Sequence, residues 1–164
     1  MDRHDFECPI NVKGAPDTIS ITKLDTAGAV VSIGLRTTRI QTGDNRMITV
    51  PNSVLGESEV INYNLPDPRY RAEIDFIAVG ESFCQIKSLI EKTVRGIEGV
   101  LADKPVDVIY LSFGGTGREI RVRWWIDSIN NLFHVQAKVL VALEKALDEA
   151  GIETPNLTYD LHVH

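Results

Sequence analysis

Several short groups of residues have backbone or side-chain groups that could bind a ligand or take part in a reaction. The Gly-Gly-Thr-Gly run at residues 114–117 could cradle a phosphate, because glycines let backbone N–H groups approach an anion closely. Cys84 lies in the first turn of an expected helix and could act as a nucleophile. His162 and His164 share one face of an expected strand with Asp160, and together they could hold a metal ion.

Each of these groups lacks a partner that its chemistry requires. The 114–117 run has no Lys-Ser/Thr ending and precedes a strand-like stretch, so we favour a hairpin turn. Cys84 has no His or Asn partner in the sequence around it, which favours a structural role. The two histidines have only Asp160 beside them, which favours a solvated strand. We therefore expect no catalytic residue, no cofactor and no metal, and we do not expect an enzyme.

Two further pairs of residues have a functional and a structural interpretation. Arg36 and Arg39 could contact an anion, but charges on the outer face of a small barrel more often form ion pairs. Trp124 and Trp125 are adjacent, so in a strand they point to opposite faces, one of them to the core. We favour the structural interpretation for both pairs.

Composition restricts the class of protein. The chain has 164 residues, of which 43% are hydrophobic and 24% are charged, and this is typical of one or two small folded domains. There are 17 Lys and Arg residues against 23 Asp and Glu residues, a net charge of -6 that disfavours nucleic acid. Cys8 and Cys84 indicate neither a zinc site nor a disulfide framework. No apolar run reaches the roughly 18 to 20 residues that cross a bilayer, and the acidic N-terminus does not resemble a secretory signal.

The stretch from residue 18 to residue 63 has the composition of short strands and tight turns. Apolar residues hold odd positions up to Leu35 and even positions from Ile40, which predicts a bulge or bend near 36–38. Leu35 would then face the core, and Leu35→Asp would unfold the barrel. Turn residues at 43–46 predict a hairpin, and Pro51 is expected to end its second strand.

The prolines at 66 and 68 indicate a domain boundary, because neither can continue a central strand. Beyond it we expect the order β-α-β-β-α, with strands at 70–79, 106–113 and 119–126. Ser82 and Gln85 form a capping box for the first helix, and the second runs from near Ser128 to Gly151. The expected core-facing residues of the first helix are Phe83, Ile86, Ile90, Val94 and Ile97. Those of the second are Leu132, Phe133, Gln136, Val139, Leu140, Leu143 and Leu147.

The last eight residues alternate between apolar and polar side chains, as a half-buried strand does. The apolar set is Leu157, Tyr159, Leu161 and Val163. An isolated strand cannot satisfy its backbone groups, so we expect this one to pair with strands of neighbouring copies in a small barrel.

The sequence from residue 28 to residue 53 resembles the signature of the small-conductance mechanosensitive channel family. The residues that carry the resemblance are Gly28, Leu35, Arg36, Thr37, Thr38, Ile40, Asp44, Pro51, Asn52 and Ser53. Asn62, Gly151 and Pro155 are similar to that family as well. The resemblance covers roughly residues 27–164.

The resemblance implies an α+β fold in three parts. These are a small Sm-like β-barrel over residues 1–66, a ferredoxin-like α/β domain over 67–153 and a C-terminal strand over 154–164. It further implies a homo-oligomer, with seven copies, that encloses a vestibule on the cytoplasmic side of the cell membrane. Ions and small osmolytes would cross this cage when tension opens a pore built by upstream membrane helices, which this chain lacks.

Two other classes of protein stay open. An Sm-like oligomeric ring that binds RNA is one, although the net charge opposes it and no aromatic ribonucleoprotein signature is present. A module that binds a small molecule is the other, and it has only fold analogy to support it.

Overall fold

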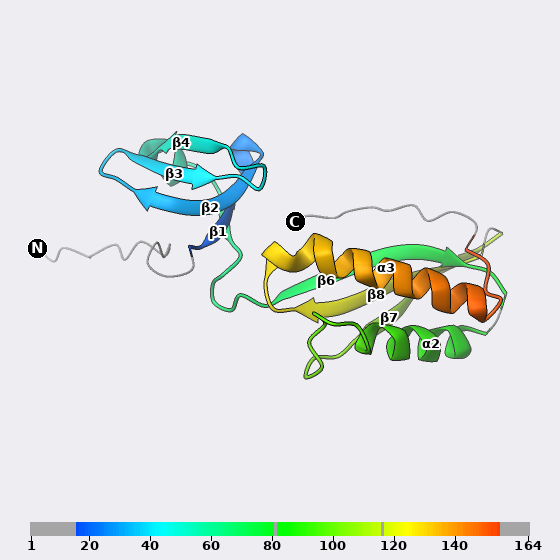
Figure 1. The fold of residues 1–164 in the computed structure, drawn as a ribbon. Helices are drawn as coiled ribbons and strands as arrows, with labels where there is room; N and C mark the ends of the chain where they lie inside the picture. The colour runs from blue at the N-terminus through cyan, green and yellow to red at the C-terminus, as the bar shows by residue number, and fades with distance from the viewer. Residues whose placement is uncertain (1–15, 81, 116, 155–164) are drawn as a thin grey trace, which may run out of the picture. The chain divides into compact units, whose positions relative to one another are not determined.

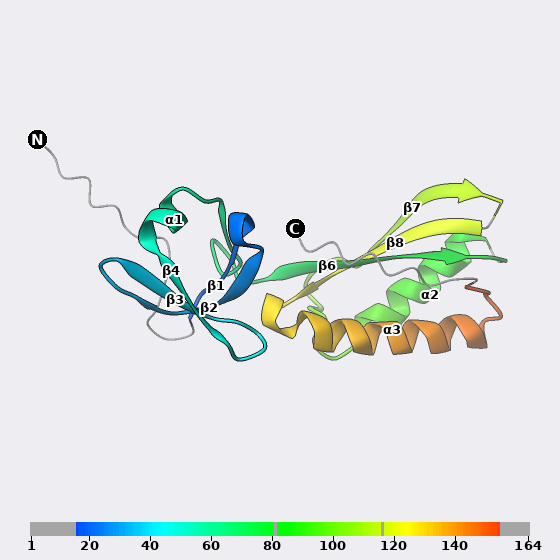
Figure 2. The ribbon, with the colours of Figure 1, turned by 90° about the horizontal axis from the view of Figure 1, so that it is seen from above.

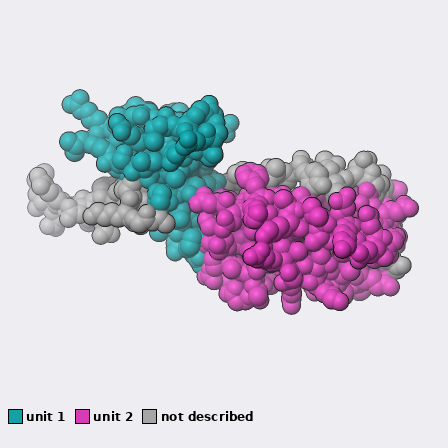
Figure 3. Space-filling model, viewed as in Figure 1, with its two compact units in different colours: residues 1–68 teal, residues 69–164 magenta. Residues whose placement is uncertain are grey.

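The computed structural model describes residues 16–80, 82–115 and 117–154 of the chain. The chain divides into two compact units, residues 1–68 (unit 1) and residues 69–164 (unit 2), which Figure 3 colours separately. Each unit contains its own sheet and its own hydrophobic core. The mixture of antiparallel sheets and separate helices confirms the expected α+β class.

Unit 1 is a curled, five-stranded antiparallel sheet in the order β4-β3-β2-β1-β5 (Figure 1). Its elements are β1 (Thr18–Ile21), a 3-10 helix (Thr22–Leu24), β2 (Thr26–Ile33), β3 (Thr37–Gln41), β4 (Met47–Pro51), α1 (Asn52–Gly56) and β5 (Val60–Asn62). Its core consists of Ile19, Ile21, Val30, Ile40 and Val50. The predicted hairpin is confirmed, because β3 pairs with β4 across the turn at 42–46, and β4 ends at Pro51 as expected.

The predicted stripe of inward-facing apolar residues at odd positions is wrong, because Val30 is fully buried whereas Val31 and Ile33 are 44% and 37% exposed. The register between β2 and β3 shifts between Val30 and Ser32, so the bulge is at Val31 and not at 36–38. Val30 pairs with the buried Ile40 before the bulge, and Ile33 pairs with the buried Thr38 after it, although Ile33 itself stays partly exposed. Residues 34–36 form a turn rather than a bent strand.

Leu35 lies in that turn, and its side chain is completely exposed, at 102% of its reference area. The expectation that Leu35 packs in the core is therefore wrong. Leu35→Asp has no buried contact to remove from unit 1.

Unit 2 is a three-stranded antiparallel sheet in the order β6-β8-β7, with two helices on one face (Figure 2). Its elements are β6 (Tyr70–Ala78), α2 (Phe83–Arg95), β7 (Asp107–Gly114), β8 (Gly117–Ile126), a 3-10 helix (Ile129–Asn131) and α3 (Leu132–Glu149). The expected β-α-β-β-α order is confirmed, and so is the hairpin that joins β7 to β8.

The helices of unit 2 begin and end where the sequence predicts. The capping box of Ser82 and Gln85 is present at the start of α2, and Ile86, Ile90 and Val94 are buried beneath it. Gly151 adopts a φ of +69° after α3, where the N–H of Ile152 donates to the carbonyl oxygen of Leu147 at 3.0 Å.

Phe133 was expected among the core-facing residues of α3, but its side chain is 69% exposed. The buried stripe starts at Leu132 and continues through Val135 and Gln136. Phe133 is turned by about 100° from Leu132 around the helix axis, which places it outside this stripe.

Candidate functional site

Gly28 lies in β2 at a point where β3 leaves no room for a side chain. A Cβ atom at this position would be 2.3 Å from the carbonyl oxygen of Gln41 and 2.9 Å from Cγ2 of Ile40. Real Cβ atoms do not approach other heavy atoms so closely. The signature glycine is therefore required by the close approach of two strands.

Asn52 ties the turn at 34–36 to the end of β4. Its side-chain Nδ2 donates to the carbonyl oxygen of Gly34 at 2.9 Å, and its backbone N–H donates to that of Arg36 at 2.9 Å. The hydroxyl of Thr38, which is buried, donates to Oδ1 of Asn52 at 2.9 Å. These three hydrogen bonds give Thr38 and Asn52, two of the predicted signature residues, a structural role, and they hold Leu35 in place on the surface.

The other signature residues around this turn are mainly exposed. Arg36, Thr37 and Arg39 are exposed, as is Ser53 in the first turn of α1. Ile40, in contrast, is fully buried in the core of unit 1. The signature thus combines residues that build the barrel with residues that present a fixed, partly cationic surface.

Asp44 lies in the turn between β3 and β4, where it accepts hydrogen bonds from Arg46 and from the hydroxyl of Thr42. These bonds lower the pKa of Asp44 from its ordinary value of 3.8 to about 2. Asn45 supplies a positive φ of 66° at the same turn, a conformation that asparagine tolerates.

We expect Arg46→Met to raise the pKa of Asp44 towards 3.8, because Arg46 is the largest cause of the lowered value. A carboxyl whose pKa is lowered on folding adds stability above its unfolded pKa, and that stability is lost as the pH falls from about 4 to about 2. An NMR titration of the Asp44 carboxyl measures the change, and Lys23→Met, at an exposed ion pair elsewhere in unit 1, is the control. An Asp44 titration that Arg46→Met leaves unaltered would contradict this assignment.

Two further signature positions, Asn62 and Gly151, stabilise the ends of secondary-structure elements. The side chain of Asn62 donates to Oδ2 of Asp17 at 3.0 Å and accepts from the backbone N–H of Asn64 at 2.9 Å, which links β5 to the start of β1. Gly151 ends α3, as described above. Pro155 and the expected strand residues Leu157, Tyr159, Leu161 and Val163 lie outside the described residues, as do His162 and His164.

The face of the unit 2 sheet opposite the helices carries a ladder of ion pairs that the sequence analysis missed. Arg121 on β8 donates through Nε and Nη2 to both carboxylate oxygens of Asp75 on β6, at 2.7 and 2.6 Å. Arg121 also lies 3.7 Å from Glu73, to which Arg123 donates at 3.0 Å. The hydrogen bonds from Arg121 to Asp75 are the main reason why the pKa of Arg121 is raised above its ordinary range.

A sequence signal for this ladder was available. Glu73 and Asp75 alternate with apolar residues on one strand, and Arg121 and Arg123 do so on another. In an antiparallel pair, such opposite charges meet across the strands on the open face.

None of the groups considered for chemistry forms a reaction centre in the described part of the chain. The glycines at 114 and 117 belong to the β7–β8 hairpin, and Cys84 is exposed and free. Among the described residues, no group of three or more His, Cys, Asp or Glu side chains could hold a metal ion. Trp124 is fully buried, while Trp125 lies on the open face beneath the ammonium group of Lys104.

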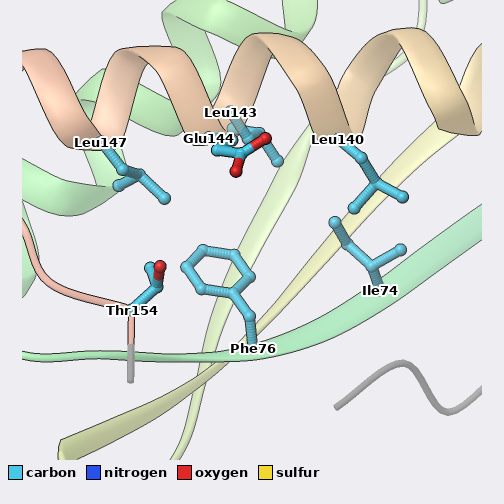
Figure 4. A pocket seen from close by; sticks show the side chains of 7 residues that line it. All are labelled: Ile74, Phe76, Leu140, Leu143, Glu144, Leu147 and Thr154. Carbon is cyan, nitrogen blue, oxygen red and sulfur yellow. The ribbon is translucent and has the colours of Figure 1, made fainter. Parts of the chain in front are cut away.

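A small apolar notch lies between β6 and α3 (Figure 4), and we call it the β6–α3 notch. Its lining residues are Ile74, Phe76, Leu140, Leu143, Glu144, Leu147 and Thr154. Aliphatic and aromatic side chains dominate it, and they offer packing rather than groups for catalysis.

Fold and surfaces together define a protein with one β-sheet unit and one α+β unit, whose notable features are a fixed surface turn, sheet edges and an ion-pair ladder. Two family models match the chain: the mechanosensitive ion channel beta-domain over residues 11–65, and the C-terminal domain of the mechanosensitive ion channel MscS over residues 78–154. The chain therefore belongs to the MscS family of mechanosensitive ion channels. The predicted family is confirmed.

Individual relatives agree with this assignment. An uncharacterised MscS family protein of Synechocystis is 28% identical over 138 residues, which are 83% of this chain and 46% of that protein. The small-conductance mechanosensitive channel of Helicobacter pylori is 22% identical over 147 residues, which are 90% of this chain and 53% of that channel. The chain thus spans about half the length of the curated relatives that it matches.

Solved structures show the same fold. The closed-state crystal structure of Helicobacter pylori MscS matches with a TM-score of 0.76 at 22% identity, over 92% of this chain and 59% of that one. The cryo-EM structure of Arabidopsis thaliana MSL1 matches with a TM-score of 0.68 at 19% identity, over 92% of this chain and 55% of that one. None of the helices in the described residues combines the length and apolar composition needed to cross a membrane.

Proposed function

We propose that this chain is the cytoplasmic vestibule part of a mechanosensitive channel. In this proposal several copies, seven by the family resemblance, form a cage around the path of ions and small osmolytes, and membrane tension opens the pore. The observation that carries the proposal is that both units match domains of one channel family, in the same order along the chain.

The edges of the unit 1 sheet support assembly into an oligomer. Strands β4 and β5 are the outermost strands of that sheet among the described residues, and neither contains a charged residue. Met47 on β4 is 52% exposed, and Val60 and Ile61 on β5 are 37% and 39% exposed. Uncharged edges with exposed apolar residues favour pairing with another chain.

Charge supports a role in ion passage. The chain has six more acidic than basic residues, so carboxylates that line a vestibule would favour cations over anions there. The signature residues then act structurally: Gly28, Thr38 and Asn52 build the barrel, and Leu35 and Arg36 are presented to neighbouring parts of the channel. An RNA-binding ring or a small-molecule module is not favoured by these relatives.

A chimeric channel tests this function. The part of the Helicobacter pylori channel that this chain does not match is joined to residues 11–164, and membrane patches from cells without their own mechanosensitive channels are put under suction. We expect currents that tension activates, with the unaltered Helicobacter pylori channel as the control. A chimera that reaches the membrane as an oligomer and passes no current under tension would contradict the proposal.

A further inference from the structure

The turn at 34–36, which joins β2 to β3 (Figure 1), holds an apolar side chain in water on a fixed backbone. Leu35 is completely exposed, at 102% of its reference area. The N–H of Gly34 donates to the carbonyl oxygen of Thr37 at 2.8 Å, and Asn52 binds the turn through its backbone and its side chain. Because these hydrogen bonds fix the turn, Leu35 has no buried position to move to within unit 1.

A single exposed leucine is ordinary on a protein surface, so the charge around the turn decides what the exposure means. The segment from residue 26 to residue 56 contains three arginines and one carboxylate, although the whole chain has more acidic than basic residues. That carboxylate, Asp44, is bound to Arg46 at the opposite end of β3. The other two arginines, Arg36 and Arg39, are exposed and form no ion pair with another described residue. The sheet around the turn is therefore locally cationic.

The surroundings of Arg39 are uncharged as well. Arg39 lies on the outer face of β3, because its neighbours Thr38 and Ile40 are buried on the inner face. Its partners across the strands are Ser32 on β2 and Thr49 on β4, whose hydroxyl groups carry no charge. This end of unit 1 thus combines an apolar tip, two unpaired guanidinium groups and hydroxyl groups.

The depth of the two arginines behind the tip matches the layered structure of a membrane surface. Arg36 follows Leu35 directly, and Arg39 lies two residues into β3, about 7 Å from its start at the rise of a strand. The headgroup layer on each side of a bilayer is about 5–8 Å thick. Both guanidinium groups would therefore reach lipid phosphates while Leu35 meets the acyl chains.

We propose that the turn at 34–36 docks on an anionic lipid surface, with Leu35 at the boundary of the acyl chains and Arg36 and Arg39 bound to lipid phosphates. An apolar residue beside cations is the pattern of segments that bind the membrane interface. A free phosphate ion would satisfy the arginines but leave Leu35 in water. A protein partner would need a pocket for the protruding side chain, whereas lipids move aside for it. The proposal goes beyond the channel function, since it concerns unit 1 of a single chain.

Partition of the full chain onto sedimented vesicles measures this contact. One set of vesicles contains phosphatidylglycerol and phosphatidylcholine in equal parts, and the other contains phosphatidylcholine alone. We expect binding to the anionic vesicles at about 50 mM salt and at least about 10-fold weaker binding at about 500 mM, because salt screens the arginines. Binding to the neutral vesicles should be weaker than binding to the anionic vesicles.

Single substitutions assign the binding to the turn. Arg36→Gln and Arg39→Gln should each lower the partition coefficient on anionic vesicles about 5-fold, the effect of one cation near such a surface. Leu35→Ser should lower it about 10-fold, because the inserted apolar area is lost. The matched controls are Lys23→Gln and Leu24→Ser, which remove an exposed cation and a leucine that is 41% exposed elsewhere in unit 1. Each control should change the coefficient less than about 2-fold.

Hydrogen exchange of peptides from β2 and β3 shows whether each variant keeps unit 1 folded. Absence of binding to anionic vesicles at low salt would overturn the proposal. Equal partition of Leu35→Ser and the unaltered chain, with unit 1 folded in both, would overturn it too, because the arginines alone would then account for the binding. The result is independent of the chimeric channel: vesicle binding without tension-activated current contradicts only the channel function, and current without vesicle binding contradicts only the lipid contact.

Discussion

Gly28→Ala is expected to unfold unit 1 while unit 2 stays folded. The new methyl group would lie 2.3 Å from the carbonyl oxygen of Gln41 and 2.8 Å from its carbonyl carbon, so β2 and β3 must separate. Their pairing brings Val30 and Ile40 together in a core that has five buried apolar residues in the described part of unit 1. Forced overpacking typically costs about 1–3 kcal/mol of folding free energy, which is a large share of the stability of a small domain.

The measurement separates the two units. Trp124 and Trp125 both belong to unit 2, so tryptophan fluorescence reports its unfolding alone. Hydrogen exchange of peptides from β2 and β3 reports unit 1, and we expect their protection to be lost. Gly43→Ala is the matched control, because a Cβ atom at Gly43 meets nothing within 4 Å. Retained protection of β2 and β3 in the Gly28→Ala variant would show that the sheet adapts to the methyl group.

The helical part of the fold was predictable from the sequence because its signals are local. The capping box at Ser82 and the glycine at 151 depend on hydrogen bonds between residues within about one helical turn of each other. Helical periodicity then identifies the buried face of α2. Phe133 was misplaced because an apolar residue beside a buried stripe looks in sequence like part of it.

The barrel was harder to predict because register depends on residues far apart in the chain. A run of alternating apolar residues fits either face, and only the pairing with β3 places the bulge at Val31. Leu35 continues the alternation in sequence, yet hydrogen bonds from Asn52 hold residues 34–36 in a turn. The ladder of Asp75 and Arg121 was overlooked for a similar reason, since its partners are 46 residues apart.

Arg121→Met is the second change for which we expect a large effect, in this case on unit 2. The guanidinium group of Arg121 forms two hydrogen bonds with Asp75 and lies close to Glu73, and its side chain is only 23% exposed. Its removal leaves two neighbouring carboxylates on a half-buried face, with Arg123 bound to Glu73 alone. Since solvent still screens part of this charge, we expect a loss of about 2 kcal/mol in the free energy of unfolding.

Arg71→Met is the matched control for this prediction, because Arg71 lies on the same face of β6, is exposed and forms no ion pair with any other described residue. A surface change of this kind costs less than about 0.5 kcal/mol. Adding Asp75→Leu to Arg121→Met should recover part of the loss, because it removes the carboxylate left without its partner. Denaturant unfolding followed by tryptophan fluorescence measures all three variants. The ladder contributes no more to the stability of unit 2 than ordinary surface charge if Arg121→Met lowers the free energy of unfolding no more than Arg71→Met does. The alternating charges on β6 and β8 would then have to be explained by contacts outside the single chain.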